Sequence, residues 1–260
     1  MFQHLALSYA AMWALVGARI SGFVVVSPFP GANVGMTPRI GLVAALSWAA
    51  SMFAPADAVP HEIALPLLVA VVCELGCGLV IGIAFRFVFM AAEVSGQLLS
   101  EGIGLSTASI LNPTIEAQDA IFARIVALVA LLIALAAGVH RVAIGYLLAS
   151  FRALPIGIGM SFPSTSMAMV DLVVTSFVVG VRLAMPVIAV SFVVHLGLGM
   201  IARAAPALQI FSVGFSVLLV TGFFVVISSI HDIGAGLNEH FASVGPWLDT
   251  LLVELSGQAP

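Results

Sequence analysis

The chain has 260 residues, of which 62% are hydrophobic and only 8% are charged, and its mean hydropathy is +1.23. A soluble domain needs charges on roughly a quarter of its residues to cover its surface, so a protein surrounded by water is excluded. The formal net charge is −4, and the eight cations, all arginines, form no basic stripe of the kind that binds nucleic acid. We therefore expect an all-α integral membrane protein whose outside contacts lipid or other protein.

Six apolar runs follow one another along the chain, and we expect each to be helical. The runs cover residues 5–27, 39–53, 63–92, 121–139, 167–200 and 208–230. Because a helix needs about 20 residues to cross a bilayer, the second run fits a partial or re-entrant segment. The fifth run is too long for one straight span and contains Pro186, which predicts a kinked helix or a hairpin. The arginines are not concentrated on one side of the runs, so no orientation follows from them.

The two ends of the chain differ in composition. Residues 1–230 are predicted to form one membrane-associated helical domain, and residues 231–260 a more polar C-terminal tail. Four leucines of this tail recur at helical spacing and predict a short amphipathic helix suited to an interface or a partner. They are Leu248, Leu251, Leu252 and Leu255.

The segment between the third and fourth runs is longer than a connection requires. Residues 100–119 read SEGIGLSTASILNPTIEAQD and are rich in glycine, serine and threonine. Connections between packed helices usually have about two to eight residues. We therefore expect a functional loop here.

Charged residues inside the apolar runs are the first candidates for a functional site, because each costs a few kcal/mol if it stays unpaired in hydrocarbon. Arg19 is one of them, and Arg86 and Glu93 are seven residues apart and therefore on roughly one helical face. Two explanations are open: structural ion pairs between packed subunits, which we favour, and a proton or ion relay. The predicted structural intramembrane charges are Glu74, Arg86, Glu93, Arg124, Asp171 and Arg182.

Small residues four positions apart predict places where two helices approach closely. Gly78 and Gly82 form one such pair, and Gly17 and Ser21 form another. Side chains this small let two helix backbones come into contact in a membrane. The pairs indicate tight helix packing.

No arrangement of residues indicates catalysis. Ser191 and His195 are four apart, as a nucleophile and a base are, but the Gly-x-Ser-x-Gly elbow and an acidic residue are missing, which favours packing or a helix–helix hydrogen bond. Cys73 and Cys77 share a helical face, where a disulfide is geometrically poor and further metal ligands are lacking. We expect no catalytic residue, no metal site and no cofactor.

Four stretches of the chain carry a resemblance to a known family. The first contains SPFPG and PR, the second IAFR, AEVSGQ and GIGL, the third GVH, and the fourth RLAMP, LGLGMIARAAP and FSVGF; they cover residues 27–39, 82–113, 138–155 and 182–215. In this order they resemble the FliR family of flagellar export-gate proteins, whose injectisome counterparts are the T-type (SctT-like) components. The chain departs from the family's pattern after Pro38, where the family often has several basic residues and this chain has only Arg39.

The resemblance implies a fold, a function and partners. The fold would consist of tilted helical hairpins that resemble one FliP-type and one FliQ-type subunit joined together. The function would be that of a subunit of the flagellar type III protein export gate, which passes unfolded flagellar proteins across the bacterial inner membrane at the basal body. FliP-type and FliQ-type subunits would be its partners, together with FlhB-type and FlhA-type components and membrane lipid.

The resemblance also gives the loop at residues 100–119 a role, that of a plug that closes the pore until a substrate opens it. Glycine and serine would supply its mobility, and isoleucine and leucine its apolar filling. The plug residues that we expect are Gly102, Ile103, Gly104, Leu105, Ser106, Ile110 and Leu111.

Three other functions are weighed against the export gate. An injectisome export component would share the same resemblance. A small-solute or ion transporter would need paired interrupted helices, for which Pro66 and Pro186 are the only faint indication. An intramembrane enzyme would need the catalytic residues that the sequence lacks.

Overall fold

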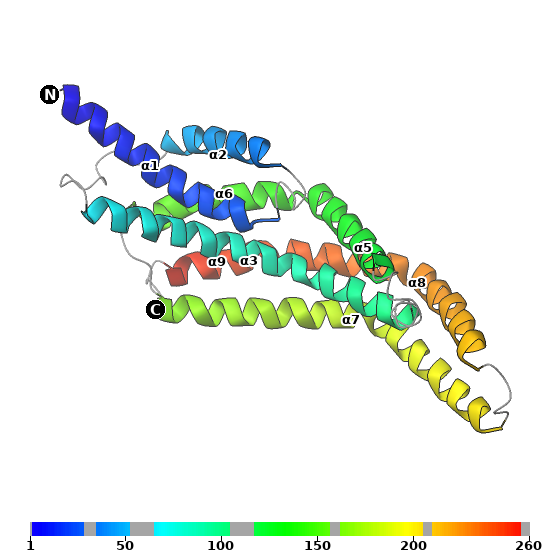
Figure 1. Ribbon diagram of the computed structural model, residues 1–260. Helices are drawn as coiled ribbons and strands as arrows, with labels where there is room; N and C mark the ends of the chain where they lie inside the picture. The colour runs from blue at the N-terminus through cyan, green and yellow to red at the C-terminus, as the bar shows by residue number, and fades with distance from the viewer. Residues whose placement is uncertain are drawn as a thin grey trace. The chain divides into compact units, whose positions relative to one another are not determined.

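A computed structural model describes residues 2–28, 35–52, 65–104, 117–156, 162–204 and 210–255. Within these ranges every regular element is an α-helix (Figure 1), which confirms the all-α expectation. The helices are α1 (Phe2–Val26), α2 (Met36–Ser51), α3 (Leu65–Ile103), α5 (Ala117–Ala136), α6 (Val139–Ala153), α7 (Phe162–Ala204), α8 (Ile210–Ala242) and α9 (Val244–Leu255).

Each of the six predicted apolar runs contains a helix, but the runs understate how far the helices extend. Helix α3 continues to Ile103, and α8 continues without a break through Ala242, past residue 230 where the sequence predicts a polar tail to begin. Helix α7 is a single helix of 43 residues that includes Pro186, so the alternative of a hairpin in the fifth run is wrong. Apolar runs end where polar residues begin, whereas a packed helix tolerates polar residues on its open face.

Helix α6 is absent from the six predicted runs. It carries His140, Arg141 and Arg152 among its 15 residues, so its mean composition is too polar for an apolar run. Its buried side chains recur every three or four positions, at Val139, Ala143, Leu147 and Ser150. This periodicity is that of an amphipathic helix with one face in a core, and it is the signal that could have predicted α6.

The chain divides into two compact units. Unit 1 comprises Met1–Val88, Gly138–Val173 and Ser243–Pro260, and unit 2 comprises Phe89–Ala137 and Val174–Ala242. The boundaries fall inside helices α3 and α7, so each of these helices contributes one part to each unit.

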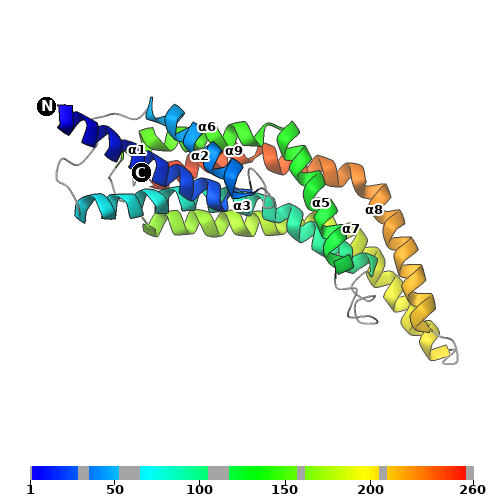
Figure 2. The same ribbon diagram turned by 45° about the horizontal axis from the view of Figure 1, so that its top comes forward.

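Unit 1 packs α1, α2, α6 and α9 with the first part of α3 and of α7. Helix α2 lies alongside α1 in both views (Figures 1 and 2). Phe23 of α1 meets Phe85 of α3 edge to face, with 5.9 Å between ring centroids. The largest side chains that are fully buried in this unit come from α1, α3 and α6, and include Leu15, Ile20, Ile81, Phe85 and Leu147.

Unit 2 packs the second part of α3 and of α7 with α5 and α8. Its core is formed by Leu99, Ile103, Ala184 and Val187, with Phe122 of α5 and Leu219 of α8 packed against them. Phe122 also meets Phe223 of α8 edge to face at 5.9 Å between ring centroids. The end of α3 is therefore held inside unit 2 by three other helices.

Long apolar helices make up most of the described chain. Three stretches are long and apolar enough to cross a membrane: Leu67–Ile103, Ser166–Arg203 and Gly214–Val253. A fourth is reached if Phe122–Ala136 and Val139–Ala153 count together as one broken span. Large apolar side chains lie exposed along these helices, as expected of a protein whose surroundings are lipid or other subunits.

Candidate functional site

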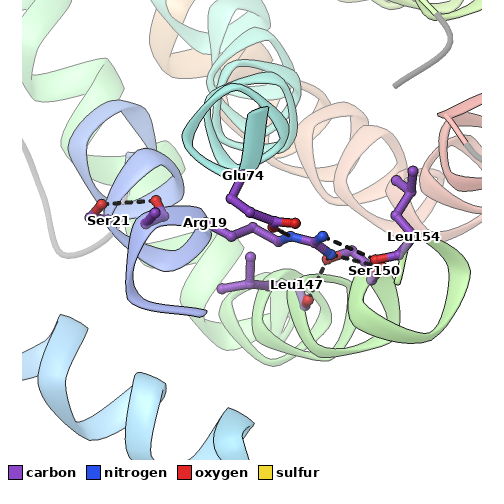
Figure 3. A network of polar contacts seen from close by, with 7 residues as sticks. Arg19, Ser21, Glu74, Leu147, Ser150 and Leu154 are labelled. Atoms are coloured by element: carbon purple, nitrogen blue, oxygen red, sulfur yellow. Dashed lines mark hydrogen bonds and ion pairs between the residues drawn. The ribbon is translucent and has the colours of Figure 1, made fainter. Parts of the chain in front are cut away.

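Among the described residues of unit 1, the largest fully buried side chain is that of Arg19 on α1 (Figure 3). Arg19 is 0% exposed, and its Nε lies 2.5 Å from Oε2 of Glu74 on α3, which is 1% exposed. Its Nη1 donates to the backbone carbonyl of Ser150 at 3.0 Å and lies 3.3 Å from the Ser150 hydroxyl oxygen. Its Nη2 donates to the carbonyl of Leu154 at 3.0 Å. One guanidinium thus joins three helices.

The carbonyls that Arg19 binds stand at the end of α6. The last carbonyls of a helix carry its partial negative charge. The Ser150 carbonyl also accepts the backbone amide of Leu154 at 2.8 Å, so Arg19 is a second donor to it and a donor to the Leu154 carbonyl, and it brings a positive charge to this end of the helix. Its Cζ lies 4.4 Å from the centroid of the Phe151 ring. The guanidinium therefore serves both as the counter-charge of Glu74 and as the C-terminal cap of α6.

Sequence reasoning identified both charges but not their pairing. Arg19 and Glu74 each stand as a lone charge in an apolar run, which signals that each needs a partner. The partner lies 55 residues away, and the capped carbonyls lie 131 and 135 residues away. Helical periodicity relates neighbours three or four positions apart, so it carries no information on such a pair.

Helices α1 and α3 approach most closely beside this ion pair. A Cβ atom added to Gly78 would overlap the backbone of Arg19, and one added to Gly82 would lie 2.8 Å from the carbonyl oxygen of Phe23. From the other side, a Cβ on Gly22 would overlap the carbonyl of Leu75. The predicted close approach at Gly78 and Gly82 is confirmed. The partner glycine on α1 is Gly22, whereas a Cβ at Gly17 would meet only the Ser47 hydroxyl at an ordinary 3.8 Å.

The other charges predicted to lie in the membrane are exposed on the isolated chain. Within unit 1 these are Arg86 and Asp171, and within unit 2 they are Glu93, Arg124 and Arg182. The structure therefore brings Glu74 together with Arg19 and leaves these five on the surface of their helices.

Three of the predicted plug residues fall in the described part of unit 2. Gly102 and Ile103 form the last turn of α3, and Gly104 follows it with φ +87° and donates its amide to the carbonyl of Glu101 at 2.9 Å. A residue with positive φ directly after a helix is the usual position of a terminating glycine. The expected loop therefore begins at the end of α3, four residues later than residue 100. Leu105, Ser106, Ile110 and Leu111 lie outside the described residues.

Ser191 of α7 holds this last turn of α3. Its hydroxyl lies 2.5 Å from the carbonyl oxygen of Gly102 and 2.7 Å from that of Val187, one turn earlier in α7. The predicted helix–helix hydrogen bond of Ser191 is confirmed. His195 Nδ1 lies 2.7 Å from the backbone carbonyl of Ser191, not from its hydroxyl, so the two side chains are not arranged as a nucleophile and its base.

The predicted amphipathic helix near the C-terminus is confirmed as α9, and it packs on α6 within unit 1. Its leucines Leu248, Leu251 and Leu252 are buried. The hydroxyl of Tyr146 on α6 lies 2.7 Å from the carbonyl of Gly245 and 2.6 Å from Oδ1 of Asp249. The apolar face that seemed suited to a partner is therefore covered by the chain itself.

The chain is similar to known proteins over most of its length. Residues 10–244 match the family model of the bacterial export proteins, family 1. Over 217 residues the chain is 28% identical to the flagellar biosynthetic protein FliR of Escherichia coli (strain K12), covering 84% of this chain and 83% of that protein. It is 27% identical over 246 residues to the protein of the same name from Pectobacterium carotovorum subsp. carotovorum, covering 94% and 93%. It is 28% identical over 220 residues to the flagellar biosynthetic protein FliR of Bacillus subtilis (strain 168), and the match covers 82% of this chain and 83% of that protein.

Proposed function

The chain belongs to the bacterial export proteins, family 1, and from this premise we propose that it is a subunit of the flagellar type III protein export gate. In this role it forms part of the wall of a pore in the inner membrane, at the flagellar basal body, through which unfolded flagellar proteins pass. The observation that carries the proposal is the match over residues 10–244, together with relatives that are named flagellar biosynthetic proteins. Those names favour a flagellar system over an injectisome.

The partners in this proposal are FliP-type and FliQ-type subunits, with FlhB-type and FlhA-type components. Exposed charges on otherwise apolar helices support an assembled state. Glu93 and Arg124 are exposed on α3 and α5, and a charge at membrane depth needs an opposite charge, a polar cavity or the headgroup region. Neighbouring subunits would supply such groups. A pore wall acts by its shape and its packing, so the proposal includes neither a catalytic residue nor a cofactor.

The proposal keeps the plug of the pore, but Gly102 and Ile103, which we expected to be part of the mobile plug, belong to the last turn of α3 and serve as its attachment. The support for the plug in the described residues is the anchoring of the end of α3. Ile103 is fully buried in the core of unit 2, and Ser191 binds the carbonyl of Gly102. A segment that closes a pore needs a rigid attachment, and this turn of α3 provides one.

Loss of the gene and separation of the complex test the export role. Deleting the gene from a flagellated strain should abolish swimming and the export of flagellar proteins, and a plasmid copy should restore both. The tagged chain should co-purify with FliP-type and FliQ-type subunits in detergent. Normal export in the deletion strain, or a chain that is a stable monomer without partners, would contradict the proposal.

The plug is tested by substitutions at its base. In Gly102→Val the new side chain would meet Val187, since a Cβ at position 102 already lies 2.8 Å from Cγ1 of Val187. We expect an altered proton leak or altered secretion. Gly197→Val is the control, because Gly197 also lies inside a helix of unit 2, α7, and a Cβ there would have no atom within 4 Å. Unchanged leak and motility after deletion of residues 106–115, with normal amounts of chain in the membrane, would exclude the plug.

The transporter alternative loses its only indication. Such a protein needs helices that are interrupted near the middle of the membrane. Helix α7 continues through Pro186, and Pro66 occupies the second position of α3, where proline is readily tolerated.

A further inference from the structure

Helices α7 and α8 are longer than a bilayer is thick. Helix α7 has 43 residues and α8 has 33. At 1.5 Å per residue they are about 65 and about 50 Å long, well over the ~30 Å of the hydrocarbon core. Only part of each helix can therefore lie in hydrocarbon at one time.

The positions of the charged residues indicate which part of α7 and of α8 lies in hydrocarbon. The whole sequence has only two stretches of 20 or more residues without Asp, Glu, Lys or Arg, namely residues 183–202 and 204–231. They are consecutive, and they coincide with the second half of α7 and the first two thirds of α8. Helix α3, by contrast, carries Glu74, Arg86, Glu93 and Glu101 at short intervals.

These two stretches pack together as a hairpin within unit 2. Leu198 lies against Gly214, where an added Cβ would be 3.0 Å from Leu198 Cδ1, and Leu183 lies against Gly236, where the distance would be 2.6 Å. The antiparallel pairing places Arg182 near the polar end of α8, which begins at His231 and Asp232. The charges at that end of the two stretches therefore lie at a similar level of the hairpin.

The hairpin has a packed inner face and an open outer face. Ala184 and Val187 are buried against α3 in the core of unit 2. The large apolar side chains exposed on α7 are Met185, Phe192, Val193, Leu196, Met200 and Ile201. Those exposed on the matching part of α8 are Val217, Val220, Phe223, Phe224, Ile227 and Ile230.

Polar side chains on the open surface bind to their own helix. The Ser228 hydroxyl donates to the carbonyl of Phe224 at 2.8 Å, and His195 Nδ1 lies 2.7 Å from the carbonyl of Ser191. Serine and histidine satisfied in this way need no water for these groups, which suits hydrocarbon.

We propose that the outer face of this hairpin, from Arg182 to Ile230, binds the lipid bilayer directly. Arg182 and Arg203 are 21 residues apart on α7, a rise of about 31 Å that matches the hydrocarbon thickness. Each guanidinium lies at one headgroup layer and binds lipid phosphate, and the charge-free residues between them contact acyl chains. The partner of this surface is a phospholipid bilayer, and the rest of α7 and α8 lies outside the hydrocarbon.

Position-specific quenching by lipid tests the inference. Single cysteines are introduced in a Cys73→Ala, Cys77→Ala background at Leu196 and Ile227, labelled with a bimane fluorophore, and compared in nanodiscs of ordinary and acyl-brominated phospholipid. The full chain is used, together with the subunits that co-purify with it. Val178→Cys is the matched control: it is 49% exposed against 56% for Leu196, on the same helix and about five turns away on the same face.

We expect brominated lipid to quench the labels at positions 196 and 227 at least about threefold more than the label at position 178, because bromine is confined to the hydrocarbon. An unquenched label at 196 would show that another subunit covers this face and would overturn the inference. Equal quenching at 178 and 196 would overturn it as well, because the hydrocarbon would then extend past Arg182. The readout is lipid contact and not export, so the result is independent of the proposed function.

Discussion

Arg19 and Glu74 form an ion pair that is shielded from solvent by the chain itself, although 55 residues separate them in the sequence. Arg19 also caps the end of α6 through the carbonyls of Ser150 and Leu154. Two buried charges with these partners cost little while all contacts are present, and they become costly when one partner is removed. The stability of unit 1 therefore depends on the ion pair and on the two carbonyl contacts of Arg19 together.

Neutralising Glu74 should destabilise the protein strongly. Glu74→Gln leaves the Arg19 guanidinium buried without its counter-charge, and we expect a loss of about 3–5 kcal/mol in the free energy of unfolding. Thermal unfolding of the purified complex in detergent measures the effect. Glu93→Gln on the exposed face of the same helix is the control, and should change stability by less than about 0.5 kcal/mol. Equal stability of the two variants would show that the buried pair is not needed.

Exchanging the two charges should not restore stability. In the double variant Arg19→Glu, Glu74→Arg the ion pair can form again, but a carboxylate then faces the carbonyls of Ser150 and Leu154. A negative charge at the C-terminus of a helix is repelled, and both carbonyls lose the donors that the guanidinium supplied, although the Ser150 carbonyl keeps the amide of Leu154. We expect the double variant to unfold at least as readily as Glu74→Gln in the same assay. Recovery of the parent stability would mean that capping of α6 contributes nothing.

The contact of α1 with α3 can be probed with two alanines. Gly78→Ala places a methyl group on the backbone of Arg19, so the helices must separate, and we expect a loss of about 1–3 kcal/mol or more. Gly145→Ala on α6 is the matched control, because a Cβ there would have no atom within 4 Å. Removing glycine from an open helical site should instead stabilise by about 0.5–1 kcal/mol. The same sign of change in both variants would contradict the close approach.

The bond between Ser191 and the end of α3 gives a prediction for unit 2. Ser191→Ala removes the donor to the Gly102 carbonyl, and we expect a loss of about 0.5–1.5 kcal/mol together with faster amide hydrogen exchange in the last turn of α3. Ser228→Ala is the control, because the Ser228 hydroxyl binds only within α8, to Phe224, and its loss should leave exchange in α3 unchanged. Identical exchange in both variants would exclude a role for Ser191 in holding that turn.

The sequence was sufficient for the class of the protein and for most of its helices. Hydropathy and the scarcity of charge exclude a water-facing fold, and the apolar runs predict six of the described helices. Helix α6 was not predicted because its polar face carries His140, Arg141 and Arg152, which make its mean composition too polar for an apolar run. Its apolar face is visible only in the helical spacing of its buried residues. The glycines at positions 78 and 82 likewise predict a close helix contact, because only a residue without a side chain allows it.

Which groups meet was decided by the tertiary structure alone. A lone arginine in an apolar run must find a partner, since an unpaired charge is costly there, and that much is readable from the sequence. Glu74, Ser150 and Leu154 become its partners only when α1, α3 and α6 pack together, because their separations in sequence exceed the range of helical periodicity. For the same reason Gly22 could be matched to Gly78, and Ser191 to Gly102, only after the helices had been placed side by side.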